Sequence, residues 1–142
     1  MEPDDEENRG IGFIASLING VISDLTIENS YINGYARTGM FVGVSGNSCV
    51  MNCLNKNNLV NGYNPVGGLI GHQEESTVIN CTTQSSYIYG DGNVGGIVGY
   101  NGRGVIKDCT CVESTVTAER WSVGGIAGIA YDTRINNCYN TS

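Results

Sequence analysis

Hydrophobic and polar positions alternate over short runs along the chain, and none of these runs has the spacing of an amphipathic helix. Runs of β-branched and aromatic residues, such as 20–23, 77–79 and 86–89, end at Gly, Asn, Asp or Ser. These bounding residues favour turns, because they tolerate a positive φ angle or bond to their own backbone. The pattern therefore predicts short β-strands separated by turns.

The strands and turns belong to a unit that repeats along the chain. Segments 66–71, 94–99 and 123–128 share the sequence Val-Gly-Gly-Leu/Ile-x-Gly, and weaker copies begin at positions 10 and 38. The starts of the five copies therefore follow a constant period, apart from a single extra residue before the last copy. This spacing divides residues 10–142 into a single domain of five units, with the limits 10–37, 38–65, 66–93, 94–122 and 123–142.

One such unit cannot bury its own apolar face, but stacked copies can. The sequence therefore predicts an all-β fold, a parallel β-solenoid of about five 28-residue coils with two or three strands in each coil. A right-handed turn is favoured, because parallel crossovers are usually right-handed. Three apolar columns are expected inside the coils: Phe13, Phe41, Leu69, Ile97 and Ile126; Ile22, Val50, Val78, Ile106 and Ile135; and Leu25, Cys53, Cys81, Cys109 and Cys138.

These repeated segments resemble the GLUG motif of bacterial surface and secreted proteins. Residues 68–71 (Gly-Leu-Ile-Gly) followed by 78–81 (Val-Ile-Asn-Cys) form the fullest copy. The resemblance covers residues 38–142 well and weakens over 10–37, where Ala15 replaces the closing Gly and Leu25 replaces Cys. It implies a passive, extracellular, solenoid-forming segment that lies beside adhesin or protease domains, and it implies no catalytic residue.

The cysteines are candidates for disulfides or a metal site. Four of the six stand in one column with Leu25, which favours a reduced, inward-facing ladder. Cys49 and Cys111 lie in other columns and are candidates for exposed thiols, with their redox state left open. Metal ligands at short paired spacings are missing from the sequence, and His72 is the single histidine. We expect no metal and no other cofactor.

A polar column holds Asp24, Asn52, Asn80, Asp108 and Asn137. Its amides cannot act as a general acid or base, and we expect them to bond to one another along the solenoid axis. Other acidic residues, among them Asp91, Asp132 and the pair at 74–75, lie in different turns without basic partners in matching columns. We therefore expect no enzymatic activity.

Charge is concentrated at the N-terminus. The net charge is −7, and residues 1–9 form an acidic tail with five carboxylates and one arginine. The seven Lys and Arg residues of the whole chain are scattered and make no stripe that could follow a phosphate backbone, so we expect no nucleic-acid partner. Apolar runs stay far below the roughly 18 residues of a membrane span, so we expect no membrane insertion.

Aromatic side chains on the strand surfaces are the candidate ligand-binding residues. Such rings stack on sugars or pack against a protein partner. Tyr is also common on exposed strands that bind nothing, because it has a high β-propensity. Trp121 lies in the turn that is one residue longer than its counterparts. The candidates are Tyr31, Tyr87, Tyr89 and Trp121, followed by Tyr35, Tyr63 and Tyr100.

Three functions remain open. The leading hypothesis is a non-catalytic structural or adhesive segment of an extracellular or surface-bound bacterial protein, joined to other domains of its parent. The first alternative is a filament subunit that stacks head to tail on copies of itself. The second is a carbohydrate-binding module. The sequence identifies no ligand or host receptor and no use for the acidic tail.

Overall fold

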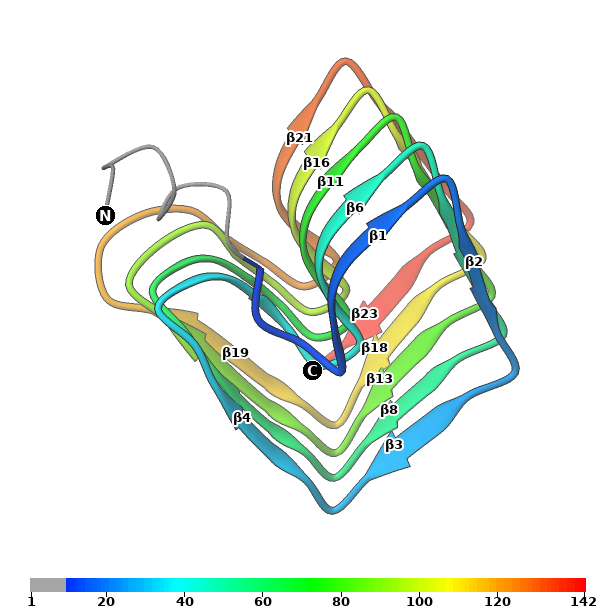
Figure 1. Ribbon diagram of the computed structural model, residues 1–142. Helices are drawn as coiled ribbons and strands as arrows, with labels where there is room; N and C mark the ends of the chain where they lie inside the picture. The colour runs from blue at the N-terminus through cyan, green and yellow to red at the C-terminus, as the bar shows by residue number, and fades with distance from the viewer. Residues whose placement is uncertain (1–9) are drawn as a thin grey trace.

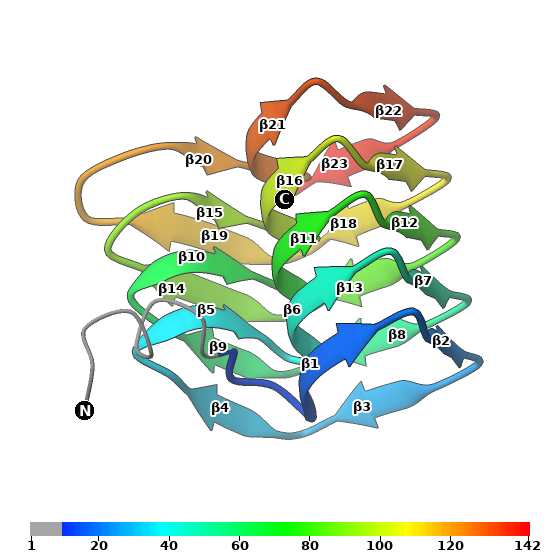
Figure 2. The same ribbon diagram turned by 45° about the horizontal axis from the view of Figure 1, so that its top comes forward.

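The computed structural model describes residues 10–142, and the acidic tail predicted at residues 1–9 lies outside them. The described residues form β-strands and turns without a helix. Every strand pairs in parallel with its counterpart in the next coil, and about five coils stack along one axis (Figure 2). The prediction of an all-β parallel β-solenoid with 28-residue coils is confirmed.

The strands of the five coils form five parallel sheets, which we name A to E. A complete coil runs through them in this order, and the first strand of the chain lies in sheet B. Sheet A contains β5 (Ala36–Gly39), β10 (Asn64–Gly67), β15 (Val94–Gly95) and β20 (Val123–Gly124). Sheet B contains β1 (Ile14–Ile18), β6 (Val42–Gly46), β11 (Ile70–Glu74), β16 (Val98–Gly102) and β21 (Ala127–Tyr131). Sheet C contains β2 (Val21–Ser23), β7 (Cys49–Met51), β12 (Thr77–Ile79), β17 (Val105–Lys107) and β22 (Arg134–Asn136). Sheet D contains β3 (Thr26–Glu28), β8 (Leu54–Lys56), β13 (Thr82–Gln84), β18 (Thr110–Val112) and β23 (Tyr139–Thr141). Sheet E contains β4 (Tyr31–Asn33), β9 (Leu59–Asn61), β14 (Tyr87–Gly90) and β19 (Thr115–Ala118).

A complete coil therefore has five strands, and the prediction of two or three was wrong. The reason lies in the corners between sheets B, C, D and E. Asn47, Asn52 and Asn57 have φ angles of 47°, 54° and 54°, and each ends a short strand. Asn tolerates this left-handed conformation better than most residues. Within a coil, these positive-φ residues follow one another at intervals of five residues, and each interval contains one short strand.

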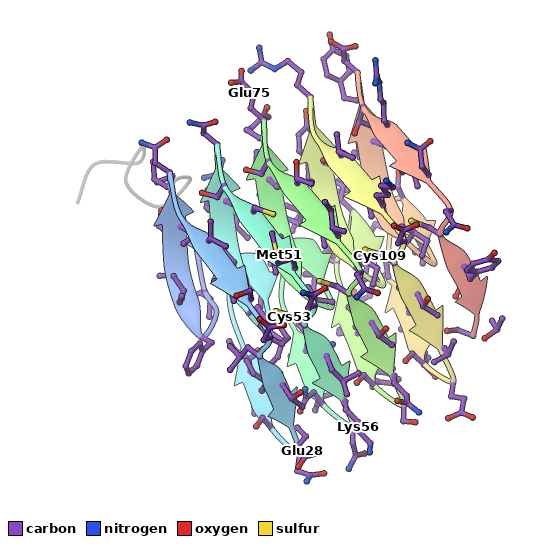
Figure 3. The ribbon with its side chains drawn as sticks, turned by 90° about the vertical axis from the view of Figure 1, so that its right-hand side faces the viewer. Glu28, Met51, Cys53, Lys56, Glu75 and Cys109 are labelled. Atoms are coloured by element: carbon purple, nitrogen blue, oxygen red, sulfur yellow. The ribbon has the colours of Figure 1, made fainter. Side chains whose placement is uncertain are left out.

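The coil is indented rather than round. Viewed along the axis, the strands trace an outline like a heart, with the indentation between sheets A and B (Figure 1). From β1 to β4 the chain runs clockwise in Figure 1. The turned views in Figures 2 and 3 show that each later coil lies farther from the viewer of Figure 1 than the coil before it. The path is therefore right-handed, as expected for parallel crossovers.

Glycines allow sheets A and B to approach each other at the indentation. A Cβ atom on Gly71 would lie 2.5 Å from the backbone nitrogen of Thr38, and one on Gly99 would lie 2.7 Å from the backbone nitrogen of Val66. Contacts this short exclude any side chain at these positions. The Val-Gly-Gly-Leu/Ile-x-Gly segments therefore mark the place where the chain folds back on itself.

The register is regular except near the two ends of the described residues. Val50, Val78 and Ile106 lie side by side at the 28-residue period, and the interval that is longer by one residue appears between Val94 and Val123. In the first coil, however, Ile11 pairs with Thr38, which is one residue short of the period.

This irregular register explains why one predicted core residue is exposed. Phe13 N–H bonds to the carbonyl of Met40, whereas Phe41 N–H bonds to the carbonyl of Leu69, one position further along the coil. A slip of one residue turns a side chain to the opposite face of a strand. Phe13 is accordingly 67% exposed, so its predicted inward position was wrong.

The predicted core is confirmed in the middle coils and open in the last one. Fully or almost fully buried members of the three columns are Phe41, Leu69, Ile97, Val50, Val78, Ile106, Cys53, Cys81 and Cys109. Ile135, in the fifth coil, is 41% exposed, and its predicted burial was wrong. Its strand β22 pairs on one side, with β17, so no further coil covers it.

Hydroxyl groups at the corners form ladders that the sequence analysis missed. Ser76 Oγ accepts a hydrogen bond from the backbone N–H of Ser48 at 3.1 Å and donates to the carbonyl of Glu74 at 2.8 Å. Ser86 and Ser114 repeat this arrangement at the corner between sheets D and E. At each corner, backbone N–H and carbonyl groups that do not pair with a neighbouring strand therefore form hydrogen bonds with a serine hydroxyl.

Candidate functional site

The outer face of sheet E brings together three of the four predicted ligand-binding residues. Register places Tyr31, Leu59 and Tyr87 in one file across the first three coils. Their exposed fractions are 59%, 37% and 43%. Tyr89 is half-buried and stands two residues further along the same strand as Tyr87, on the same face.

These side chains line a shallow, open depression together with Asn61. Asn61 Nδ2 donates a hydrogen bond to Asn33 Oδ1 at 3.0 Å, and the Tyr89 hydroxyl bonds to the carboxylate of Glu119. This bond is the main reason that the pKa of Tyr89 is raised, so its hydroxyl stays neutral at physiological pH. The depression offers aromatic and aliphatic surface with an amide and a phenol at its edge, and none of its lining residues carries a charge.

Trp121 lies outside this depression. It is 56% exposed, as predicted for the longer turn, but its ring covers the backbone of Gly92 in the preceding coil. In the same turn, Arg120 Nε lies 3.0 Å from Asp91 Oδ1. Trp121 therefore packs against the turn at the tip of the lobe formed by sheets E and A, and the structure does not join it to the three tyrosines.

The other predicted candidates, Tyr35, Tyr63 and Tyr100, each belong to a stacked pair. Tyr35 and Tyr63, both exposed, have ring centroids 5.2 Å apart and almost parallel planes. Tyr100 is half-buried and stacks on His72 with centroids 4.6 Å apart. Both pairs join residues of adjacent coils, so these rings have partners inside the molecule.

His72 also belongs to a small charged cluster on the outer face of sheet B. Its Nε2 lies 3.4 Å from Glu74 Oε1, and Arg103 lies 3.5 Å from the other oxygen of Glu74. Burial, followed by repulsion from Arg37, lowers the pKa of His72 despite the opposing effect of Glu74. The imidazole is therefore neutral at pH 7, and Arg103 serves as the cationic partner of Glu74. The expectation that the pair at 74–75 and Asp91 lack basic partners was wrong, because Arg103 and Arg120 reach them from the adjacent coil.

Free thiols line the corner between sheets C and D, as predicted for the cysteine column (Figure 3). Cys81 Sγ donates to the carbonyl of Ile79 at 3.3 Å, and Cys109 Sγ donates to that of Lys107 at 3.2 Å. The neighbouring thiols of Cys109 and Cys53, followed by burial, raise the pKa of Cys81. A protonated thiol that donates to a backbone carbonyl acts like the corner hydroxyls.

The other two cysteines differ from each other in exposure. Cys111 is fully buried, so the expectation that it could be an exposed thiol was wrong. Its column holds Asn55 and Thr83, whose side chains also point inward and bond to the carbonyls of Gly68 and Gly96. Burial raises the pKa of the Cys111 thiol. Cys49 is half-buried on the outer face of sheet C.

The predicted amide ladder forms at the same corner. Asn80 Nδ2 donates to Asn52 Oδ1 at 2.9 Å, and Asn137 Nδ2 donates to Asp108 Oδ1 at 2.6 Å. The three Asn side chains are exposed, Asp108 is half-buried, and all four belong to corner residues with positive φ. Their role is structural, because each one bonds to the equivalent residue in the adjacent coil.

Two features of the described residues bear on metal and membrane binding. Within residues 10–142, no three His, Cys, Asp or Glu side chains gather in a way that could hold a metal ion. The same residues contain no helix that is long and apolar enough to cross a membrane.

Leu59 and Asn61 are the depression residues that sequence reasoning missed. The signal was present, because Leu59 stands one period away from both Tyr31 and Tyr87, and Asn61 stands one period away from Tyr89. Neither residue has an aromatic ring, which was the property expected of a ligand-binding side chain.

Two stretches of the chain, residues 90–117 and 119–142, match the family model described as the GLUG motif. Residues 90–142 contain two copies of the GLUG motif. The predicted resemblance is thus confirmed over the fourth and fifth coils, and each GLUG repeat corresponds to about one coil, the first running from Gly90 to Thr117 in β19. No curated protein matches the chain. With GLUG repeats and a β-solenoid fold, the chain is a structural domain built from repeats.

Proposed function

We propose that this chain is a non-catalytic segment of a bacterial surface or secreted protein, and that its stacked coils space and present an adhesive face outside the cell. The single observation that carries this proposal is the file of exposed side chains on sheet E. Tyr31, Leu59 and Tyr87 face solvent across three coils. Exposed apolar side chains held in a row on a rigid scaffold are typical of an interaction site.

The inward side chains support a structural role for the rest of the coil. Val50 and Ile106 fill the core, and polar residues such as Asn55 bond to backbone carbonyls across the interior. Inward positions therefore serve packing and hydrogen bonding, which leaves the outer faces to meet other molecules. GLUG repeats over the fourth and fifth coils fit the same role.

The composition of the sheet E depression supports a non-catalytic role. Hydrolysis of a polysaccharide uses two carboxyl groups on either side of the bond that is cut. Five residues line the depression, and none of them is an acid, a base activated by a neighbour, or a nucleophile of the Ser or Cys type. The depression can bind a molecule but lacks the groups to transform it.

The cellular location can be tested with antibodies raised against the purified chain. We expect them to label intact cells of the bacterium that encodes the chain, or to detect the parent protein in the culture medium. Detection only after the cells have been lysed would contradict the proposal.

The adhesive role can be tested with beads that carry the purified chain. Such beads should be retained under flow on a layer of extracellular matrix or mucus more strongly than beads that carry Ile106→Asp, a variant that we expect to unfold because it puts a charge in the core. Equal retention of the two kinds of bead would show that the folded surface is not adhesive. This test does not depend on the chemical class of the ligand.

A further inference from the structure

The depression on sheet E has the chemistry of a site for an uncharged ligand. Its side chains are two tyrosine rings, a leucine, an amide and a further phenol. Lys, Arg, Asp and Glu are missing from this lining, so no lining side chain carries a charge that would select a phosphate, a carboxylate or an ammonium ion. Aromatic rings instead provide flat apolar surface for the C–H faces of a ligand.

The polar groups of the depression lie at its edge. An amide has two N–H donors and an oxygen with two lone pairs, so the bond from Asn61 to Asn33 leaves Asn61 further capacity. The hydroxyl of Tyr89 donates to Glu119, and its oxygen can still accept a hydrogen bond. Alternating apolar C–H faces and hydroxyl groups, as in a neutral sugar, complement this arrangement of rings and edge groups.

The spacing along the axis indicates a chain of sugars rather than a single one. Tyr31 and Tyr87 are two coils apart, which corresponds to about 10 Å at the usual strand spacing. This separation is close to the length of a disaccharide unit in an extended glycan. Leu59 lies between the two rings in the same file, so the apolar surface runs continuously along the axis.

The small extent of the exposed apolar surface argues against a protein partner. A stable protein interface buries roughly 800 Å² on each partner, with a continuous apolar centre. On sheet E the exposed apolar file consists of three side chains, and the next residues along it and beside it are polar: Thr115, Asn33, Asn61 and Thr117. A narrow aromatic strip with a polar border suits an extended ligand of small cross-section.

We propose that the outer face of sheet E binds an extended neutral oligosaccharide that lies along the solenoid axis, with Tyr31 and Tyr87 stacking on two of its sugar rings. Asn61 and Tyr89 bond to its hydroxyl groups from the edge of the depression. Trp121 has no part in this site, since it packs on Gly92. The inference rests on the proposed adhesive role and specifies the ligand class and the face that binds it.

The experiment combines a glycan array with titration calorimetry on the full chain. The array includes neutral β-linked glucose, xylose and N-acetylglucosamine hexasaccharides, their disaccharides, and uronate-containing and sulfated chains. We expect binding of at least one neutral hexasaccharide, with at least tenfold weaker binding of its disaccharide. Binding restricted to the anionic chains, or to none of the glycans, would overturn the proposal.

Matched variants link the binding to this face. Changing both tyrosines in Tyr31→Ser/Tyr87→Ser should weaken hexasaccharide binding at least tenfold and leave the melting temperature almost unchanged, because both side chains point outward. Tyr131→Ser removes a comparably exposed ring from sheet B and should leave the affinity unaltered. Equal loss in both variants, or loss in neither, would contradict the assignment to sheet E.

The outcomes also separate this inference from the broader proposed function. If antibodies label intact cells and beads adhere while no glycan binds, the adhesive role stands and the oligosaccharide assignment fails. If, in addition, Tyr31→Ser/Tyr87→Ser abolishes adhesion to a surface coated with protein alone, sheet E is a protein-binding face and the proposal is overturned. If a neutral hexasaccharide binds but the parent protein stays inside the cell, the proposed location fails and the sugar site remains.

Discussion

Single residues with left-handed backbone conformation give this solenoid its corners. Asn52, Asn80 and Asp108 occupy one corner in successive coils, with φ angles of 54°, 52° and 53°. Asn and Asp adopt this conformation more readily than most residues, and their side chains bond along the axis. Each corner ends a strand after about three residues and turns the following side chain into the core. The chemistry of one residue type, repeated at every coil, thus sets the cross-section.

Ile106→Asp tests whether the apolar columns point inward. Ile106 is fully buried between Val78 and Ile135 of the adjacent coils, so its replacement leaves an unpaired charge in the core. We expect a loss of about 3–5 kcal/mol in the free energy of unfolding, measured by urea denaturation. Lys107→Asp changes the next residue, which is exposed, and should cost less than about 0.5 kcal/mol. Cooperative unfolding with near-native stability in Ile106→Asp would contradict the assignment.

His72 gives the stability of the protein a specific dependence on pH. Burial, followed by repulsion from Arg37, lowers its pKa in the folded state, while Glu74 and the stacked Tyr100 complete its surroundings. In the unfolded chain the pKa of His72 is near 6.5. Below that pH the unfolded chain therefore binds a proton at His72 more readily than the folded chain does. Stability should therefore fall as the pH decreases from 7 to 5.

The variant His72→Phe isolates this contribution, because it retains a ring that can stack on Tyr100. Its urea midpoint should decrease less than that of the original chain between pH 7 and pH 5. If the midpoints of the two proteins decrease equally, the histidine does not carry the effect.

At the scale of elements, the indentation between sheets A and B depends on glycine. Sheets C, D and E meet at corners with bonded side chains, whereas sheets A and B approach each other through their backbones. Gly71 and Gly99 lie at positions where a Cβ would come within 3 Å of the opposite backbone. Glycine loses more conformational entropy on folding than other residues. The backbone contacts between sheets A and B, which only glycine permits here, offset this loss.

Gly71→Ala tests the close approach directly. Its Cβ would lie 2.5 Å from backbone atoms of both Arg37 and Thr38, neither of which can yield without moving a strand. We expect a loss of about 1–3 kcal/mol in the free energy of unfolding. Gly46→Ala is the matched control, because its Cβ would approach a single atom, at the end of the exposed side chain of Ile18. Equal effects of the two substitutions would show that the sheets do not meet as described.

The sequence predicted the register of the elements well and their number poorly. Columns at the 28-residue period identify which strands pair, because each residue stacks on its own counterpart, as Val50 does on Val78. The number of strands depends on corners that include Glu75, Arg103 and Glu113, which all have positive φ but are not typical turn residues. In these places the neighbouring coils, rather than local preference, determine the backbone conformation.

The candidate site was predictable to a similar extent. Tyr31 and Tyr87 lie two periods apart, so their common file follows from the repeat alone. Trp121 is a candidate from the same sequence argument but lies elsewhere, because its contact with Gly92 depends on how the longer turn folds over its neighbour. Phe13 was wrongly placed in the core for a comparable reason, since a one-residue slip in the first coil does not show in the sequence columns.

At the scale of the whole molecule, each coil meets mainly the coils directly before and after it. The strands of sheets B, C and D pair in the order of the coils, and sheets A and E continue the same order. Stability in such a fold is roughly the sum of the coils and of the contacts between neighbours. Function then belongs to faces that several coils build together, as on sheet E.

The central claim is that successive coils stack so that residues one period apart in the sequence lie in contact. Nuclear Overhauser spectroscopy on the chain with labelled Val and Ile methyl groups measures this most directly. The structure predicts cross-peaks between the methyl groups of Val50 and Val78 and between those of Val78 and Ile106, which are paired in neighbouring strands. It predicts no cross-peak between Val50 and Ile106, which are about 10 Å apart across two coils. Missing cross-peaks for the two adjacent pairs in the folded protein would contradict the stacked solenoid.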